Sequence, residues 1–164
     1  MPHRASIPSL HLCYDGFVPF AQVKDLLKRT AAYHRTVAAY YKKIESHTQK
    51  EPVKQITDYL ATHERCLSRE LQQFAREQDH ELSEAWIQAD PSYDLERVVG
   101  ELKIDEDTTV EDIILTGVEL NRRLIKYFQR MAEVAPSDAL KEMFLNMEKS
   151  ELEEQKKLAS WNQY

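Results

Sequence analysis

Four polar residues fall on the otherwise apolar faces of predicted helices, and their types could bind a metal ion. When successive residues are placed 100° apart, each of the four lies near the centre of an apolar stripe and near the middle of its helix. The four are His34, Glu64, Asn121 and Glu151. A carboxylate buried alone is very costly, so such a group must pair, be protonated or bind a metal. Carboxylate and imidazole groups are ligands of iron, manganese and zinc, so this set predicts a candidate metal site between helices.

Four amphipathic segments must position these residues. Apolar residues recur at helical spacing from 19 to 48, from 51 to about 78, after 109 and after 137. Pro19, Pro52 and Pro136 lie in opening turns, where the missing N–H of proline is not needed. The third segment follows a capping cluster in which Glu111 lies three residues after Thr108. We expect an N-terminal arm over 1–18, a helical hairpin over 19–78, a crossover over 79–106 and a second hairpin over 107–164.

The lengths of the connections indicate how these helices are arranged. Short connections make antiparallel neighbours within each hairpin. The segment between the hairpins contains Trp86, Ile87 and Tyr93, so it is too apolar for a free linker. We interpret it as an extension of the second helix followed by a packed crossover that runs the length of the bundle. The predicted fold is therefore all-α, an up-down four-helix bundle of two hairpins joined by a long crossover. The middles of its helices meet, so the four polar residues should share one layer.

The two predicted hairpins also align with each other at a single offset of 87 residues. At this offset His34 falls on Asn121 and Glu64 falls on Glu151. One offset serves both helices of each hairpin. The pattern is that of a duplicated hairpin, which would give pseudo-twofold symmetry. Coincidence between two similar amphipathic hairpins is the alternative.

This pattern resembles the ferritin-like superfamily, which includes rubrerythrin-type and related uncharacterised four-helix bundles, over residues 19–164. Di-iron sites of that superfamily take a Glu from the first and third helices and Glu-x-x-His from the second and fourth. The family Glu is present at Glu64 and Glu151, whereas its two His positions are Leu67 and Glu154. The remaining two Glu positions are occupied by His34 and Asn121. The resemblance therefore implies a degenerate site for iron or manganese, with His34, Glu64, Glu151 and Glu154 as ligands and Asn121 as a weak one.

A second interpretation of the polar layer needs no metal. His34 could pair with Glu64, and Asn121 with Glu151, as two buried polar pairs that fix the register of the helices. This interpretation predicts a structural or partner-binding bundle, and the missing family ligands favour a non-enzymatic role. Gly117 lies one turn before Asn121 on the apolar face, where it either lets helices approach closely or leaves space for a ligand.

Composition excludes several classes of protein. Only 3 Gly and 6 Pro in 164 residues, with 30% charged residues, argue against a many-stranded sheet protein. A net charge of −6 argues against a general nucleic-acid binder. No apolar run reaches the length of about 18 residues that spans a membrane, and residues 1–16 lack the apolar core of a secretory signal. We therefore expect a cytoplasmic protein.

Some side chains carry weaker predictions. Cys13 and Cys66 are too few for a disulfide framework or a zinc site. His63 and Cys66 could join Glu64 in a second, off-centre set of metal ligands. The alternative is that both residues lie at the edge of the apolar stripe and bind nothing. Aromatic enrichment at interfaces makes three residues candidates for a homodimer face, and the sequence does not identify any other protein partner. These are Trp86, Trp161 and Tyr164.

Overall fold

The computed structural model describes residues 20–88 and 95–161, and this part of the chain is mostly helical. The elements in chain order are β1 (Phe20–Gln22), α1 (Val23–His47), α2 (Glu51–Glu77), α3 (His80–Ser83), β2 (Trp86–Gln88), α4 (Leu95–Gly100), α5 (Val110–Glu133) and α6 (Asp138–Ser160). The expectation of a mostly helical fold is confirmed. The small sheet of β1 and β2 was not expected, so the all-α prediction is correct only in this coarser form. The predicted arm over 1–18 lies outside the described residues.

Local chemistry explains where the long helices begin. The side chain of Thr109 accepts a hydrogen bond from the N–H of Asp112, whose carboxylate in turn accepts from the N–H of Thr109. This capping box starts α5, so the predicted pair of Thr108 and Glu111 was one residue early. Ser137 caps α6 by accepting from the N–H of Leu140. The proline predicted in the opening turn of α2 is found at the start of that helix.

The first helix starts later than predicted because a strand precedes it. Strand β1 pairs antiparallel with β2, with Ala21 opposite Ile87. The face that carries Ile87 is buried, whereas Phe20 and Trp86 lie on the other face and are each 62% exposed. The N–H of Val23, the first residue of α1, donates to the carbonyl of Ala85. The sheet and this hydrogen bond therefore connect the start of α1 to the segment that follows α2.

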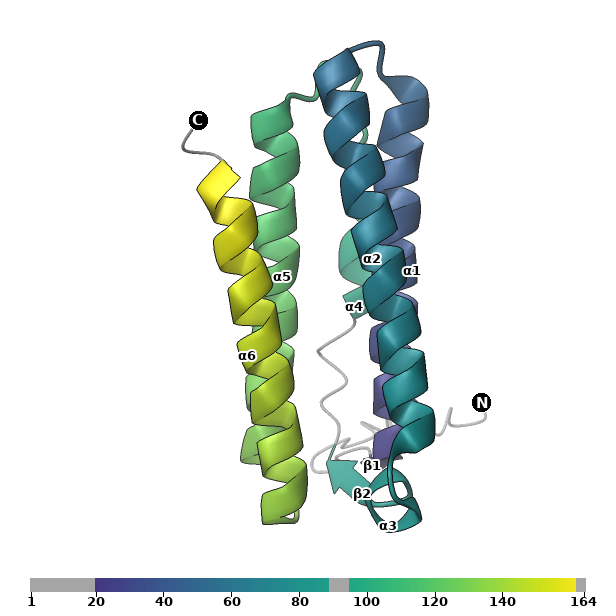
Figure 1. Cartoon of the computed structure of the whole chain (residues 1–164), viewed down its shortest axis with the longest axis vertical. Helices are drawn as coiled ribbons and strands as arrows, with labels where there is room; N and C mark the ends of the chain where they lie inside the picture. Colours follow the sequence, from purple (N-terminus) through teal and green to yellow (C-terminus); the bar gives the residue numbers. More distant parts are fainter. Residues whose placement is uncertain (1–19, 89–94, 162–164) are drawn as a thin grey trace, which may run out of the picture.

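The crossover differs from the predicted helix extension. Helix α2 ends at Glu77, because Gln78 has an extended backbone conformation. The four-residue helix α3, strand β2 and the short helix α4 follow. In Figure 1 this segment leads from the lower end of α2 back to the upper start of α5, so that α2 and α5 run in the same direction. It therefore runs the length of the long helices, as the crossover was expected to do.

The four long helices form two antiparallel hairpins, α1 with α2 and α5 with α6, which Figure 1 shows side by side. The starts of α1 and α5 are 87 residues apart, at Val23 and Val110, and those of α2 and α6 are also 87 apart, at Glu51 and Asp138. This agrees with the offset of the sequence repeat. The hydroxyl of Tyr33 donates to the carbonyl of Leu120, which is the equivalent position in the second hairpin.

Apolar side chains from all four long helices fill the interior. The largest fully buried ones include Leu27, Tyr41, Phe128 and Phe144. Gly117 of α5 is packed closely by two side chains, since a Cβ there would meet Leu158 Cδ2 of α6 at 2.5 Å and Tyr41 Oη of α1 at 3.0 Å. Close packing is therefore its role. Within the described residues, none of the helices has an apolar stretch long enough to cross a membrane.

Candidate functional site

Three of the predicted site residues meet in the core. His34 of α1 is 2% exposed, Glu64 of α2 is 8% exposed and Glu151 of α6 is 7% exposed. Nδ1 of His34 lies 2.7 Å from Oε2 of Glu64, and its Nε2 lies 3.8 Å from Oε1 of Glu151. We call these residues the buried triad. The imidazole ring bridges the two carboxyl groups, so the predicted His34–Glu64 pair is confirmed and Glu151 joins it from the other hairpin.

His34 and Glu151 of the buried triad hold their protons more tightly than they would in water. Burial by itself lowers the pKa of His34, but the hydrogen bond and negative charge of Glu64, with the charge of Glu151, raise it overall. Burial raises the pKa of Glu151 from 4.5 to about 7; His34 opposes this rise, whereas Glu64 and Glu154 add to it. The triad therefore favours a cationic imidazole beside a carboxyl group that titrates close to neutral pH.

Two tyrosines next to the triad do not supply a base. The ring of Tyr33 meets the ring of His34 edge-on, with centroids 5.8 Å apart. Burial raises the pKa of both Tyr33 and Tyr41, and the negative charge of Glu64 raises each further. Their phenol groups stay protonated at neutral pH. Tyr33 was not among the predicted site residues. It directly precedes His34 in the sequence, and this adjacency could have identified it.

The other two predicted ligands, Asn121 and Glu154, lie near the triad but do not bond to it. No hydrogen bond joins Asn121 to Glu151 within the described part of the chain, so the predicted second polar pair is not formed. Glu151 lies instead beside His34, because a cationic imidazole attracts a carboxylate more strongly than a neutral amide does. Glu154 pairs with His63 Nε2 at 2.9 Å and with Lys157 Nζ at 2.7 Å. Asn121 and Glu154 line a small cavity of about 40 Å³ that also touches Glu64.

The off-centre set of His63 and Cys66 is also not assembled. His63 stacks on Tyr59, with ring centroids 6.3 Å apart, and Tyr59 contacts Trp161 edge-on. The sulfur of Cys66 accepts a hydrogen bond from Arg69. Among the residues that the structure describes, no group of three or more His, Cys, Asp or Glu side chains is arranged to hold a metal ion.

The di-iron set implied by the ferritin-like resemblance does not fit these residues. The imidazole ring of His34 occupies the space between the two carboxyl groups, and one of its nitrogens already bonds to Glu64. Leu67 stands at one histidine position and has no metal-binding atom. Glu154, at the other, is directed to His63 and Lys157. In this chain a histidine ring lies between the carboxyl groups of Glu64 and Glu151.

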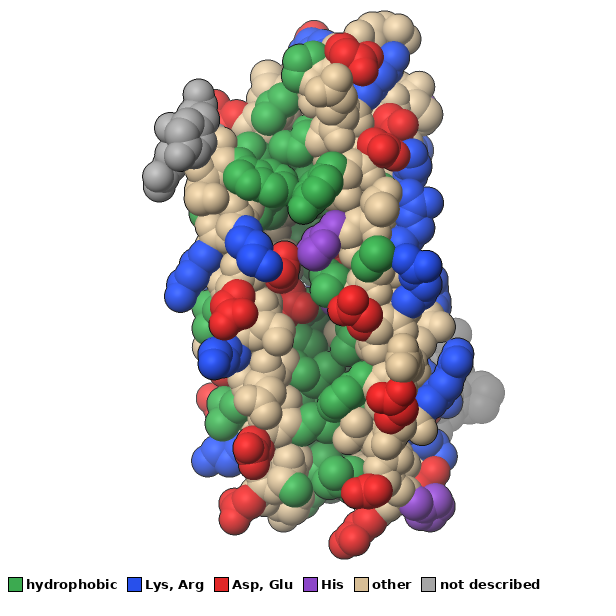
Figure 2. All heavy atoms as spheres, in the orientation of Figure 1, with side chains coloured by type: hydrophobic (Ala, Val, Ile, Leu, Met, Phe, Trp, Pro, Cys, Tyr) green, Lys and Arg blue, Asp and Glu red, His purple; other side chains and the backbone are tan. Residues whose placement is uncertain are grey.

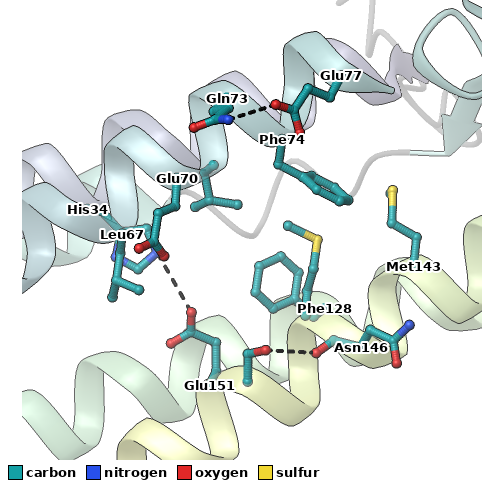
Figure 3. A pocket seen from close by; sticks show the side chains of 13 residues that line it. His34, Leu67, Glu70, Gln73, Phe74, Glu77, Phe128, Met143, Asn146 and Glu151 are labelled. Atoms are coloured by element: carbon teal, nitrogen blue, oxygen red, sulfur yellow. Dashed lines mark hydrogen bonds and ion pairs between the residues drawn. The ribbon is translucent and has the colours of Figure 1, made fainter. Parts of the chain in front are cut away.

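A groove of about 530 Å³ opens beside the triad, between α2 and α6. Figure 2 shows hydrophobic side chains along this furrow and acidic side chains on both of its sides. The apolar lining residues are Leu67, Leu71, Phe74, Phe128, Met143 and Met147. His34 and Glu151 also line it, and Figure 3 shows them at one end of the groove, with Phe74 and Met143 toward the other. We call this feature the groove.

The end of the groove that touches the triad has unsatisfied polar atoms. Nε2 of His34 is fully buried and has no hydrogen-bond partner within the described residues. Glu151 accepts no hydrogen bond from the described residues and is held only by the 3.8 Å approach of His34. An interior polar group without a partner is costly, and such groups in native proteins call for an explanation. The groove thus joins apolar walls to a small number of converging polar atoms, which is typical of ligand sites.

No protein-family model matches this chain, and neither does any curated protein or solved structure.

Proposed function

We propose that this chain is a non-enzymatic helical protein that binds a small, mostly apolar ligand in the groove between α2 and α6. The observation that carries this proposal is a groove of about 530 Å³ with His34 and Glu151 in its lining, where Nε2 of His34 has no hydrogen-bond partner within the described residues. Its volume lies in the range of about 300 to 1,000 Å³ that small-molecule sites occupy. A ligand would cover the apolar walls and satisfy the polar atoms at the same time.

We further propose that the long helices form a ferritin-like four-helix bundle in which His34 replaces the metal. A buried imidazolium between Glu64 and Glu151 compensates negative charge, as a metal ion does in the resembled di-iron proteins. This arrangement leaves the bundle stable without a metal and its interior free to bind an organic ligand. The tyrosines beside the triad stay protonated at neutral pH, so they do not supply a base to the groove.

Binding of the neutral dye Nile red tests the proposed site. Ser150 lies on the exposed rim of the groove, so Ser150→Trp should fill the groove without disturbing the core. Leu145→Trp is the matched control, because Leu145 is exposed on the same helix and does not line the groove. We expect dye fluorescence to rise on the wild type and on Leu145→Trp, and to be lost on Ser150→Trp. Absence of dye binding to the wild type, or unchanged binding to a folded Ser150→Trp variant, would refute the proposal.

A second candidate function is the binding of one iron or manganese ion. It is favoured by one observation, the unpartnered Nε2 of His34 at 3.8 Å from Glu151. Elemental analysis of protein purified without chelator, before and after reconstitution with each metal, tests it. About one ion per chain, lost in Glu151→Gln, would support this function over the first. Metal content at background in both samples would reject it.

A further inference from the structure

The charges of the groove identify the class of ligand, on the assumption that the proposed binding function is correct. Of the residues that line it, Glu70, Glu77 and Glu151 are acidic, and none is Lys or Arg. Glu70 on α2 and Glu151 on α6 belong to opposite walls, and Figure 3 shows both at the end of the groove where His34 lies. An anionic ligand would face these carboxyl groups with no cation other than His34, which Glu64 already compensates.

In the described part of the chain, carboxyl oxygens from two helices lack donors at the end of the groove where His34 lies. Within the described residues, Glu151 accepts no hydrogen bond, and Glu70 makes neither a hydrogen bond nor an ion pair. An ammonium group carries three N–H donors and no acceptor, which matches carboxyl groups that converge from two walls. A hydroxyl group offers a single donor, and a carboxylate offers none. The negative charge of the lining and its free hydrogen-bond acceptors therefore both favour an ammonium group.

The rest of the groove favours a ligand whose remaining part is a hydrocarbon chain or ring. Phe74 and Met143 line the part away from the triad, and Phe128 and Met147 are also in the lining. Aromatic rings and thioethers adapt to flat or flexible hydrocarbon chains. We propose that the groove binds a hydrophobic primary amine, with its ammonium group between Glu70 and Glu151 and its alkyl or aryl chain along the apolar walls. A polyamine is excluded by the apolar lining, and a fatty acid is excluded by the acidic one.

Three probes with the same skeleton test this inference on the full-length protein. They are 4-phenylbutylamine, 4-phenylbutanol and 4-phenylbutyric acid, each titrated against bound Nile red at neutral pH. We expect the amine to bind at least about tenfold more tightly than the alcohol, because a charge-assisted pair in a partly buried site is worth that much. The acid should bind most weakly. Equal binding of the three, or tighter binding of the acid, would overturn the inference while leaving the groove as a binding site.

A matched pair of variants assigns the preference to the groove. Glu70 is exposed, so Glu70→Gln removes one charge without disturbing the core. We expect this variant to reduce the preference for the amine over the alcohol by about threefold or more. An ion pair between the ammonium group and an exposed carboxylate contributes a free energy of this order. Glu142→Gln, on an exposed part of α6 outside the groove, should leave that preference unchanged. An equal effect of both variants would reject the assignment. If Nile red and all three probes fail to bind, the proposed function and this inference both fail.

Discussion

Replacing Glu151 by Gln should flatten the dependence of stability on pH. The pKa of Glu151 rises from 4.5 to about 7 in the folded protein, mainly because the carboxyl group is buried. The folded state thus holds this proton more tightly than the unfolded state does. Its contribution to stability is complete below pH 4.5 and is lost as the pH rises through about 7. The raised pKa of His34 acts with the same sign, because stability from a cationic imidazole is also lost as the pH rises.

The size of the effect follows from the shift. A pKa difference of this size corresponds to about 3 kcal/mol, and Glu151 is nearly fully buried, so solvent screening reduces it little. Urea unfolding followed by circular dichroism at several pH values between about 5 and 8 measures it. We expect the wild type to lose most of this free energy over that range. Glu151→Gln cannot titrate and resembles the protonated acid in shape, so it should lose much less and should be the more stable protein at the alkaline end.

An exposed glutamate of the same helix provides the control. Glu142→Gln should keep the pH dependence of the wild type, since Glu142 lies in solvent. If Glu151→Gln loses stability as steeply as the wild type, the carboxyl group does not bind its proton in the way that the geometry implies. The reasoning about the buried triad would then be wrong.

Three other contacts can be tested by substitution, with stability measured by urea unfolding at neutral pH. Thr109→Ala removes the capping box of α5 and should cost about 1 kcal/mol, whereas Thr108→Ala should cost less, since Thr108 bonds only to a carbonyl that precedes the helix. Tyr33→Phe removes the buried hydrogen bond to Leu120 and should cost about 1 kcal/mol; an unchanged midpoint would show that the contact adds nothing. His34→Leu leaves two buried carboxyl groups without their cation and should cost about 3 to 5 kcal/mol; a loss below about 1 kcal/mol would contradict the role of the imidazole.

Apolar periodicity was sufficient to predict the long helices. Helix α2 was expected over 51–78 and spans Glu51–Glu77, because its apolar stripe is continuous and Pro52 marks its first turn. The two short strands were missed, since three residues are too few for an alternating pattern and Trp86–Gln88 pairs with a segment far away in the chain. The one-residue error at α5 has a similar origin. Both Thr108 and Thr109 have an acidic residue three positions later, and only the backbone geometry selects one of them.

The site was predictable only in part. His34, Glu64 and Glu151 could be found because each is a polar residue at the centre of an apolar stripe. Asn121 satisfied the same rule but lies partly exposed beside the small cavity, since stripe position gives an angle around one helix and not the distance to the next. The groove could not be predicted for the same reason. Phe74 and Met147 have the spacing of core residues, and only the separation of the two hairpins leaves them along an open furrow.

Rebuilding the ligand set offers the strongest test of the ferritin-like resemblance. The substitutions His34→Glu and Asn121→Glu would supply the missing carboxylates of the first and third helices. Leu67→His and Glu154→His would supply the two missing imidazoles. These positions are close enough to converge, because Leu67, Asn121 and Glu154 line one small cavity with Glu64, and His34 contacts the carboxyl groups of both Glu64 and Glu151. Four neighbouring carboxylates without the imidazolium, three of them at buried positions, need compensating charge, which two divalent ions would provide.

The fourfold variant should therefore be less stable than the wild type without metal and should regain stability on addition of ferrous iron under anaerobic conditions. The expected rise follows from mass action, since a ligand that binds only the folded state stabilises it by about 4 kcal/mol at a thousandfold excess over its dissociation constant. Thermal unfolding with and without iron, together with elemental analysis, measures both effects. The same variant with Glu64→Gln added should respond less to iron. If a folded fourfold variant binds no more iron than the wild type, these positions do not correspond in space to the ligand positions of ferritin-like di-iron proteins. The proposed relationship would then fail.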